Sequence, residues 1–219
     1  MNILAIDHVQ FALPDPMASA ALLTRCGYAL DFQEPDFNTE TRSFYRGVAK
    51  SMAYLHRGTS RIEVITCTGI AGRTRYVPMF GGTACPDGLE NLPNEKSLDG
   101  VIVRARHADR SAIFWQFLGF KPVMPDRFAF PPNMLSMPLN VSLDRNPPQQ
   151  DADVMADDPG CASVALITRD IHADLAALDQ AGYPASEATR FRINGRHVTI
   201  CFVTGPSSEL VELVEFGRT

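Results

Sequence analysis

The sequence lacks a basic patch, paired cysteines and any long uninterrupted apolar run. Its 20 Lys and Arg residues are scattered and the formal net charge is −5, which argues against the concentrated positive surface that nucleic acids require. The five cysteines are widely spaced without a C-x-x-C pair, so we expect neither a disulfide framework nor a structural zinc site. No stretch approaches the length of a membrane span, and Asp7 and His8 interrupt the apolar N-terminal segment. We therefore expect a cytoplasmic protein without nucleic-acid or membrane partners.

The remaining composition is that of an ordinary globular protein. The 219 residues are 45% hydrophobic and 21% charged, so the chain can bury a core as one large domain or as two small ones. The common catalytic signatures are absent: there is no G-x-S-x-G, no P-loop, no G-x-G-x-x-G after a strand and no H-E-x-x-H. Any chemistry must therefore come from residues that the fold brings together.

A repeated spacing divides the chain into three similar parts. Three glycine–aromatic pairs, each after a stretch of helical composition, mark the repeat: Gly27-Tyr28, Gly119-Phe120 and Gly182-Tyr183. Twelve residues before these glycines stand Asp15, His107 and Asp170, and seven residues further back stand His8, Gly100 and Ser163. An apolar strand lies between these marks each time, and the two aspartates are expected to cap their helices. The identical spacing predicts an α+β fold built from three βαβββ units.

The expected units span residues 1–66, 98–143 and 161–219, and the second unit is degenerate. Residues 67–97 are rich in Gly and Pro, so we expect an irregular loop or lid there. Residues 144–160 are acidic and rich in Pro, which is typical of a tether between units.

The first expected strand, at the start of residues 6–15, has two different faces. Alternation sends Val9, Phe11 and Leu13 to one face and His8, Gln10 and Ala12 to the other. Such a strand can serve a core on one side and a cavity on the other.

The repeated unit opens on D-H-V-x-x-x-x-x-D and closes on E-L-V-E-L-V-E, and in both respects it resembles the vicinal oxygen chelate superfamily. That superfamily includes glyoxalase I, extradiol dioxygenases, methylmalonyl-CoA epimerase and the bleomycin resistance proteins. The resemblance implies that two units pair into a curved sheet whose concave side holds one divalent metal. The ligands would come from the first strand of each unit and from the last strand of one or both.

Carried onto this sequence, the superfamily pattern places metal ligands at His8, Glu63 and Glu212. The chain departs from the pattern at Gly100 and Ser163, the first-strand positions of the second and third units. Only the first and third units together supply three ligands, so we expect these two to face each other across the cavity. The second unit would then pack outside or form the contact of a homodimer. One nitrogen and two oxygen ligands suit Mn²⁺, Fe²⁺ or Zn²⁺.

Two functions remain open at this point. The first is a metal-dependent glyoxalase/dioxygenase-type enzyme (a dioxygenase, lyase or isomerase) acting on a small oxygen-bearing substrate, with His56 or His197 as a general base. The alternative is a metal-free protein that binds or sequesters a small molecule, as the bleomycin resistance proteins do. Gly100 and Ser163 favour this alternative, and Glu63 also has a plain structural interpretation as a carboxylate paired with Arg61.

Overall fold

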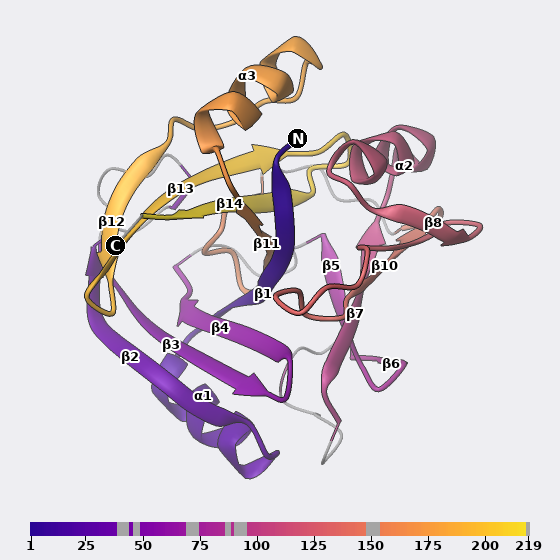
Figure 1. Cartoon of the computed structure of the whole chain (residues 1–219). Helices are drawn as coiled ribbons and strands as arrows, with labels where there is room; N and C mark the ends of the chain where they lie inside the picture. Colours follow the sequence, from indigo (N-terminus) through magenta and orange to yellow (C-terminus); the bar gives the residue numbers. More distant parts are fainter. Residues whose placement is uncertain are drawn as a thin grey trace.

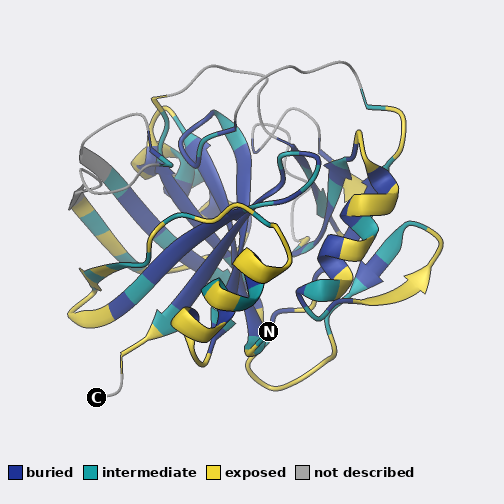
Figure 2. Cartoon of the chain, turned by 90° about the horizontal axis from the view of Figure 1, so that it is seen from above, coloured by how far each residue is buried: buried dark blue, intermediate teal, exposed yellow. Residues whose placement is uncertain are grey.

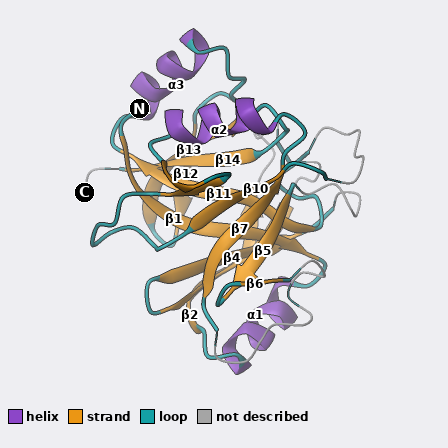
Figure 3. Ribbon diagram, turned by 90° about the vertical axis from the view of Figure 1, so that its right-hand side faces the viewer, coloured by secondary structure: helices purple, strands orange, loops and turns teal. Residues whose placement is uncertain are grey.

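The computed structural model describes residues 1–38, 44–45, 49–68, 75–85, 89, 96–147 and 154–217. Within these residues the chain forms two β-sheets and three helices (Figure 1). The helices lie outside the sheets: α1 (Pro16–Arg25) is at one end, and α2 (Ala108–Phe117) and α3 (Ile171–Gln180) are at the other (Figure 3). None of the helices in this part of the chain is long and apolar enough to cross a membrane.

The larger sheet has eight strands in the order β12-β13-β14-β11-β1-β4-β3-β2. Its strands are β1 (Ile3–Leu13), β2 (Ala29–Asn38), β3 (Ala49–Arg57), β4 (Ser60–Thr66), β11 (Gly160–Thr168), β12 (Thr189–Ile193), β13 (Arg196–Thr204) and β14 (Leu210–Phe216). The first and third repeats meet where β1 pairs antiparallel with β11, and each of these strands pairs in parallel with the last strand of its own repeat. The first and third repeats thus share one curved sheet, the pairing that the ligand count predicted.

The smaller sheet has six strands in the order β6-β5-β7-β10-β9-β8. They are β5 (Tyr76–Phe80), β6 (Thr83–Ala84), β7 (Leu98–Arg104), β8 (Lys121–Met124), β9 (Arg127–Ala129) and β10 (Asn140–Asp144). The prediction that residues 67–97 are irregular is wrong for β5 and β6. The expectation rested on the Gly and Pro content of the segment, but Pro78, which has no N–H to donate, still takes part in the sheet because its carbonyl accepts a 2.8 Å hydrogen bond from Cys85 N. In the first repeat, one edge of β1 pairs with β11. In the second repeat, β5 pairs with the corresponding edge of β7.

An apolar core joins the two sheets and the inner faces of the helices. It draws large side chains from every repeat, among them Phe11, Trp115 and Leu213, which are fully buried. Hydrogen bonds also cross between the sheets: Tyr28 Oη accepts from Leu98 N at 2.8 Å, and Tyr76 Oη donates to the Leu210 carbonyl at 2.9 Å. Figure 2 shows the result, with buried strands inside and exposed outer faces on the helices. The second repeat therefore packs behind the eight-stranded sheet.

The helix caps expected at the two aspartates are confirmed, and the glycine of each glycine–aromatic pair follows a helix. Asp15 accepts hydrogen bonds from Met17 N and Ala18 N at the start of α1, and Asp170 accepts one from Ala173 N at the start of α3. The glycines that follow the three helices all have positive φ angles, a conformation that a side chain would strain: Gly27, Gly119 and Gly182.

A second apolar cluster lies on the concave face of the large sheet. Tyr45 and Phe202 meet there with Ala156, which belongs to the segment expected to be a tether. Ala156 is held on both sides, because its carbonyl accepts from Gln10 Nε2 at 2.8 Å and its amide donates to the Phe44 carbonyl at 2.8 Å. The part of residues 144–160 from 154 onward is therefore packed against the sheet, while residues 148–153 lie outside the described residues.

Candidate metal centre

The parallel strand pairs place two glutamates at equivalent points of the repeat. Glu63 on β4 lies beside Gln10 on β1, and Glu212 on β14 lies beside Ala165 on β11. Gln10 stands two residues after His8, and Ala165 holds the same place in the third repeat. Because β1 and β11 are neighbours at the centre of the sheet, the two glutamates approach the middle of the concave face from opposite sides.

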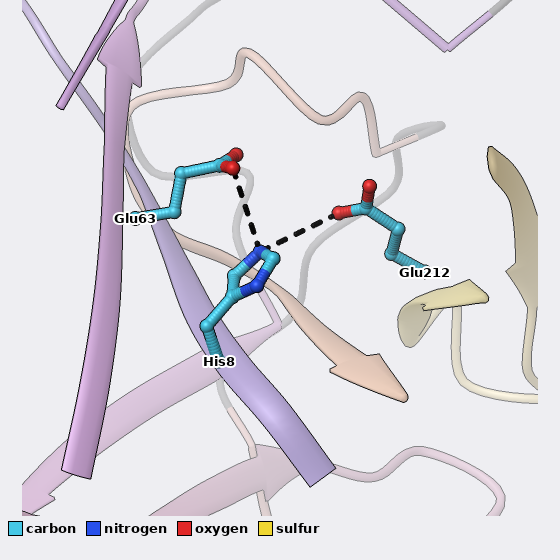
Figure 4. A group of neighbouring side chains, drawn as sticks. All are labelled: His8, Glu63 and Glu212. Atoms are coloured by element: carbon cyan, nitrogen blue, oxygen red, sulfur yellow. Dashed lines mark ion pairs between the residues drawn. The ribbon is translucent and has the colours of Figure 1, made fainter. Parts of the chain in front are cut away.

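The three predicted ligands meet there. His8 Nε2 lies 3.7 Å from Glu63 Oε2 and 3.7 Å from Glu212 Oε2, and one ligand atom from each residue lies within 4.8 Å of the others. Figure 4 shows both carboxylates directed at the imidazole from two sides. All three side chains are buried. The structure therefore contains a candidate His/Glu metal site made by the first and third repeats.

The spacing of these atoms suits an ion better than direct contact. A distance of 3.7 Å is too long for a hydrogen bond, and among the described residues His8 Nε2 and Glu212 Oε2 have no hydrogen-bond partner although both are buried. Buried polar atoms are nearly always satisfied. An ion about 2.0–2.2 Å from each ligand atom fits between atoms this far apart. The donor set and its geometry thus fit a divalent metal.

The carboxylates around His8 also raise the pKa of its imidazole. Burial alone would lower the pKa of its imidazole, but the carboxylates of Glu63, Asp7 and Glu212 outweigh burial and raise that pKa well above 6.5. A positive charge at this point is therefore strongly favoured, either as a proton on the imidazole or as a metal that replaces the proton.

Asp7 is a site residue that sequence reasoning missed. Its Oδ2 lies 3.0 Å from His8 Nδ1 and accepts a hydrogen bond from Tyr54 Oη at 3.2 Å, while Arg61 approaches its Oδ1 at 3.5 Å. Burial tends to raise the pKa of the Asp7 carboxyl, but the hydrogen bond and charge of His8, together with Arg61, lower it below 3.8. Arg61 thus contacts Asp7, where the sequence suggested that it might neutralise Glu63.

The other candidate residues lie elsewhere. Ser163 stands at a first-strand ligand position, but its hydroxyl donates a 3.0 Å hydrogen bond to Gln10 Oε1 on the neighbouring strand β1. His56 is half-exposed on β3, two residues after Tyr54 and so on the same face of the strand, and its Nδ1 is 2.8 Å from Asp31 Oδ1. His197 alternates with Val198, which lines the cavity, and therefore lies on the opposite face of β13. The structure does not bring His197 to the three ligands.

A cavity of about 300 Å³ contains the three ligands. Its walls are largely apolar and come from both halves of the sheet: Phe32, Ile193, Val198, Ile200, Val214 and Phe216. Asp31, Asn194 and Arg196 are exposed members of the lining. The two edges of the large sheet approach each other here, since Asn194 N donates a 2.7 Å hydrogen bond to Glu34 Oε1 on β2 (Figure 1). The site is thus a half-open, mostly apolar cup around an acidic centre.

Comparison with solved structures agrees with this architecture. A glyoxalase I variant from Zea mays superposes with a TM-score of 0.56 over 96% of this chain and 93% of that chain, at 16% sequence identity. The chain has the vicinal oxygen chelate fold. The comparison also found a methylmalonyl-CoA epimerase from Mycobacterium tuberculosis, at 15% identity, a TM-score of 0.45 and coverage of 99% of this chain and 91% of that chain. No family profile and no curated protein matches the sequence, so the likeness is one of fold.

Proposed function

We propose that the protein is a metal-dependent enzyme of the glyoxalase/dioxygenase type that acts on a small oxygen-bearing substrate. The observation that carries the proposal is the convergence of His8 Nε2 and Glu212 Oε2, both buried and without a hydrogen-bond partner among the described residues, on one point beside Glu63. These residues would hold one divalent ion, of which Mn²⁺, Fe²⁺ and Zn²⁺ suit the donor set. Three protein ligands leave further coordination positions for substrate oxygens.

Bound there, the ion would supply Lewis acidity to the substrate oxygen atoms. The protein would supply position and exclusion of water. The apolar walls strengthen charge interactions at the floor of the cup because they keep the local dielectric low. Phe32 stacks on Tyr54 with ring centroids 5.3 Å apart and an interplanar angle of 9°, so one wall of the cavity is aromatic.

The charges around the cup favour a substrate with an anionic group away from the ion. The floor holds the acidic side chains, whereas the exposed part of the lining holds Arg196 and also Asp31, whose carboxylate pairs with His56. A guanidinium there suits a carboxylate or phosphate. Of the two predicted bases, His56 stays in the proposal, since its hydrogen bond to Asp31 connects it to the lining. Among the residues that the structure describes, no side-chain hydrogen bond connects His197 to the lining.

The alternative function is a metal-free protein that binds a small molecule in the same cup. Ser163 favours it, because this residue stands at a ligand position and gives its hydroxyl to Gln10.

Elemental analysis of the purified protein, after incubation with Mn²⁺, Fe²⁺ or Zn²⁺ and removal of free metal, separates the two functions. We expect one equivalent of metal in the wild type and a loss in both His8→Ala and Glu212→Ala. Glu215→Ala is the matched control, because Glu215 lies on β14 beyond the site and accepts a 2.8 Å hydrogen bond from Ile171 N. Stoichiometric metal that survives both site substitutions would refute the site. No metal binding after supplementation would favour the binding-protein alternative.

A further inference from the structure

An irregularity in β1 places two consecutive side chains at the metal site. In the pairing of β1 with β11, Ile6 lies opposite Leu166 and Val9 lies opposite Val164, so three steps along β1 match two steps along β11. One extra residue is therefore present on β1 at positions 7–8, which is a β-bulge. A regular strand would send Asp7 and His8 to opposite faces, but here both line the cavity.

The bulge brings a buried carboxylate to the far side of the imidazole from the candidate ion. Asp7 Oδ2 lies 3.0 Å from His8 Nδ1, and Tyr54 Oη donates to the same oxygen at 3.2 Å. The Tyr54 ring also contacts the imidazole edge-to-face, with ring centroids 5.4 Å apart.

These contacts fix the tautomer of His8. An ionised carboxylate can only accept hydrogen bonds, so His8 Nδ1 must carry the proton when it bonds to Asp7 Oδ2. In a neutral imidazole, Nε2 then presents its lone pair toward Glu63 and Glu212, which lie 3.7 Å away. The carboxylate also makes the imidazole a more basic ligand.

We propose that Asp7 is a positioning residue of the metal centre, which holds the His8 ring and its Nδ1–H tautomer so that Nε2 binds the ion. The inference rests on the proposed function, because it concerns the metal held by His8, Glu63 and Glu212. The competing explanation is that Asp7 is only an ion-pair partner of Arg61, which lies 3.5 Å from Asp7 Oδ1. In that case Asp7 would affect stability and leave metal affinity unchanged.

Competition between the protein and a chromogenic chelator for Zn²⁺ measures the affinity directly. We expect Asp7→Asn, which keeps the size of the side chain and removes its charge, to bind Zn²⁺ about 10–100-fold more weakly than the wild type. We expect Asp7→Glu to recover part of the loss. The matched control is Asp99→Asn, because Asp99 precedes Gly100 as Asp7 precedes His8, and no ligand stands at Gly100. Its Zn²⁺ affinity should equal that of the wild type.

A second measurement needs only the wild type and stays informative if the variants do not fold. Two-dimensional ¹H–¹⁵N NMR of the Zn²⁺-loaded protein, labelled in histidine, reports which ring nitrogen of His8 bears the proton. We expect a protonated Nδ1 and a metal-bound Nε2. A metal-bound Nδ1 would overturn the inference, as would a folded Asp7→Asn protein with wild-type affinity.

The two proposals fail in different ways in these experiments. If His8→Ala weakens Zn²⁺ binding while Asp7→Asn does not, the proposed metal centre is supported and the proposed role of Asp7 is refuted. If the wild type binds no Zn²⁺, or if His8→Ala binds it as tightly as the wild type, the proposed function falls and the inference falls with it.

Discussion

Replacing Glu212 by glutamine should stabilise the metal-free protein and abolish its stabilisation by metal. Without an ion, Glu212 is a buried carboxylate between a favourable and an unfavourable charge. At an effective dielectric constant of about 20, a protonated His8 at 3.7 Å contributes roughly 4.5 kcal/mol of attraction. At the same dielectric constant, the Glu63 ligand oxygen within 4.8 Å contributes at least about 3.5 kcal/mol of repulsion.

The two charge interactions nearly cancel, so the desolvation of Glu212 decides the sign. That penalty is several kcal/mol per buried ion, and glutamine avoids most of it. His8 keeps two carboxylate neighbours in the variant, Asp7 and Glu63, and is not left as an unpaired buried charge. We therefore expect Glu212→Gln to raise the free energy of unfolding of the metal-free protein by about 1–3 kcal/mol.

Metal should offset most or all of this difference in stability. At a free concentration of 100 times Kd, the ion adds about 2.7 kcal/mol to the wild type, or roughly 5–11 °C in Tm for a chain of this size. Urea unfolding followed by circular dichroism, with EDTA and with Mn²⁺, measures both effects. Glu215→Gln is the control on the same strand and should keep the metal-dependent gain. A Glu212→Gln protein that is less stable in EDTA, or that gains as much from Mn²⁺ as the wild type, would refute the reasoning.

Three further outcomes follow from buried polar groups outside the ligand set. Gln10→Leu should lower the free energy of unfolding by about 2–4 kcal/mol in urea titrations and leave metal affinity unchanged, because it strands Ser163 Oγ and the Ala156 carbonyl. Asp174→Ala should cost about 3 kcal/mol or more in the same assay, since the fully buried Asp174 carboxylate accepts hydrogen bonds from Asn2 N and Thr168 Oγ1. Burial raises the pKa of Glu209 above 4.5, so the folded state holds its proton more tightly than the unfolded state and the wild type loses stability as pH rises through that raised pKa. The stability of Glu209→Gln relative to the wild type should therefore increase from pH 4 to pH 7, and a constant difference would contradict the assignment.

The repeat explains why much of the fold could be predicted from the sequence. Helix caps and positive-φ glycines are local signals, and they recur at Asp15 and Asp170 and after each helix. Glu63 and Glu212 could be assigned from the resemblance to the vicinal oxygen chelate pattern, and each lies on a last strand that pairs in parallel with the first strand of its own unit. The prediction that both glutamates lie near His8 depended on one further observation: only the first and third units together supply three ligands.

The parts that could not be predicted depend on departures from regular structure. Alternation along residues 6–15 assigns Asp7 to the face opposite His8, and nothing in the sequence marks the bulge that turns it inward. Strand β5 contains Pro78, which lowers any strand expectation, and its partner β7 is distant in sequence. The packing of Ala156 against Gln10 is likewise a tertiary contact without a local pattern.

Anomalous X-ray diffraction from crystals of the Zn²⁺-loaded protein, collected on both sides of the zinc absorption edge, tests the metal centre most directly. The account predicts one strong anomalous peak on the concave face, about 2.0–2.2 Å from His8 Nε2 and from one carboxylate oxygen each of Glu63 and Glu212. It also predicts that the peak is absent in Glu212→Ala. A peak at another place, or one that leaves Glu212 out of coordination, would contradict the account.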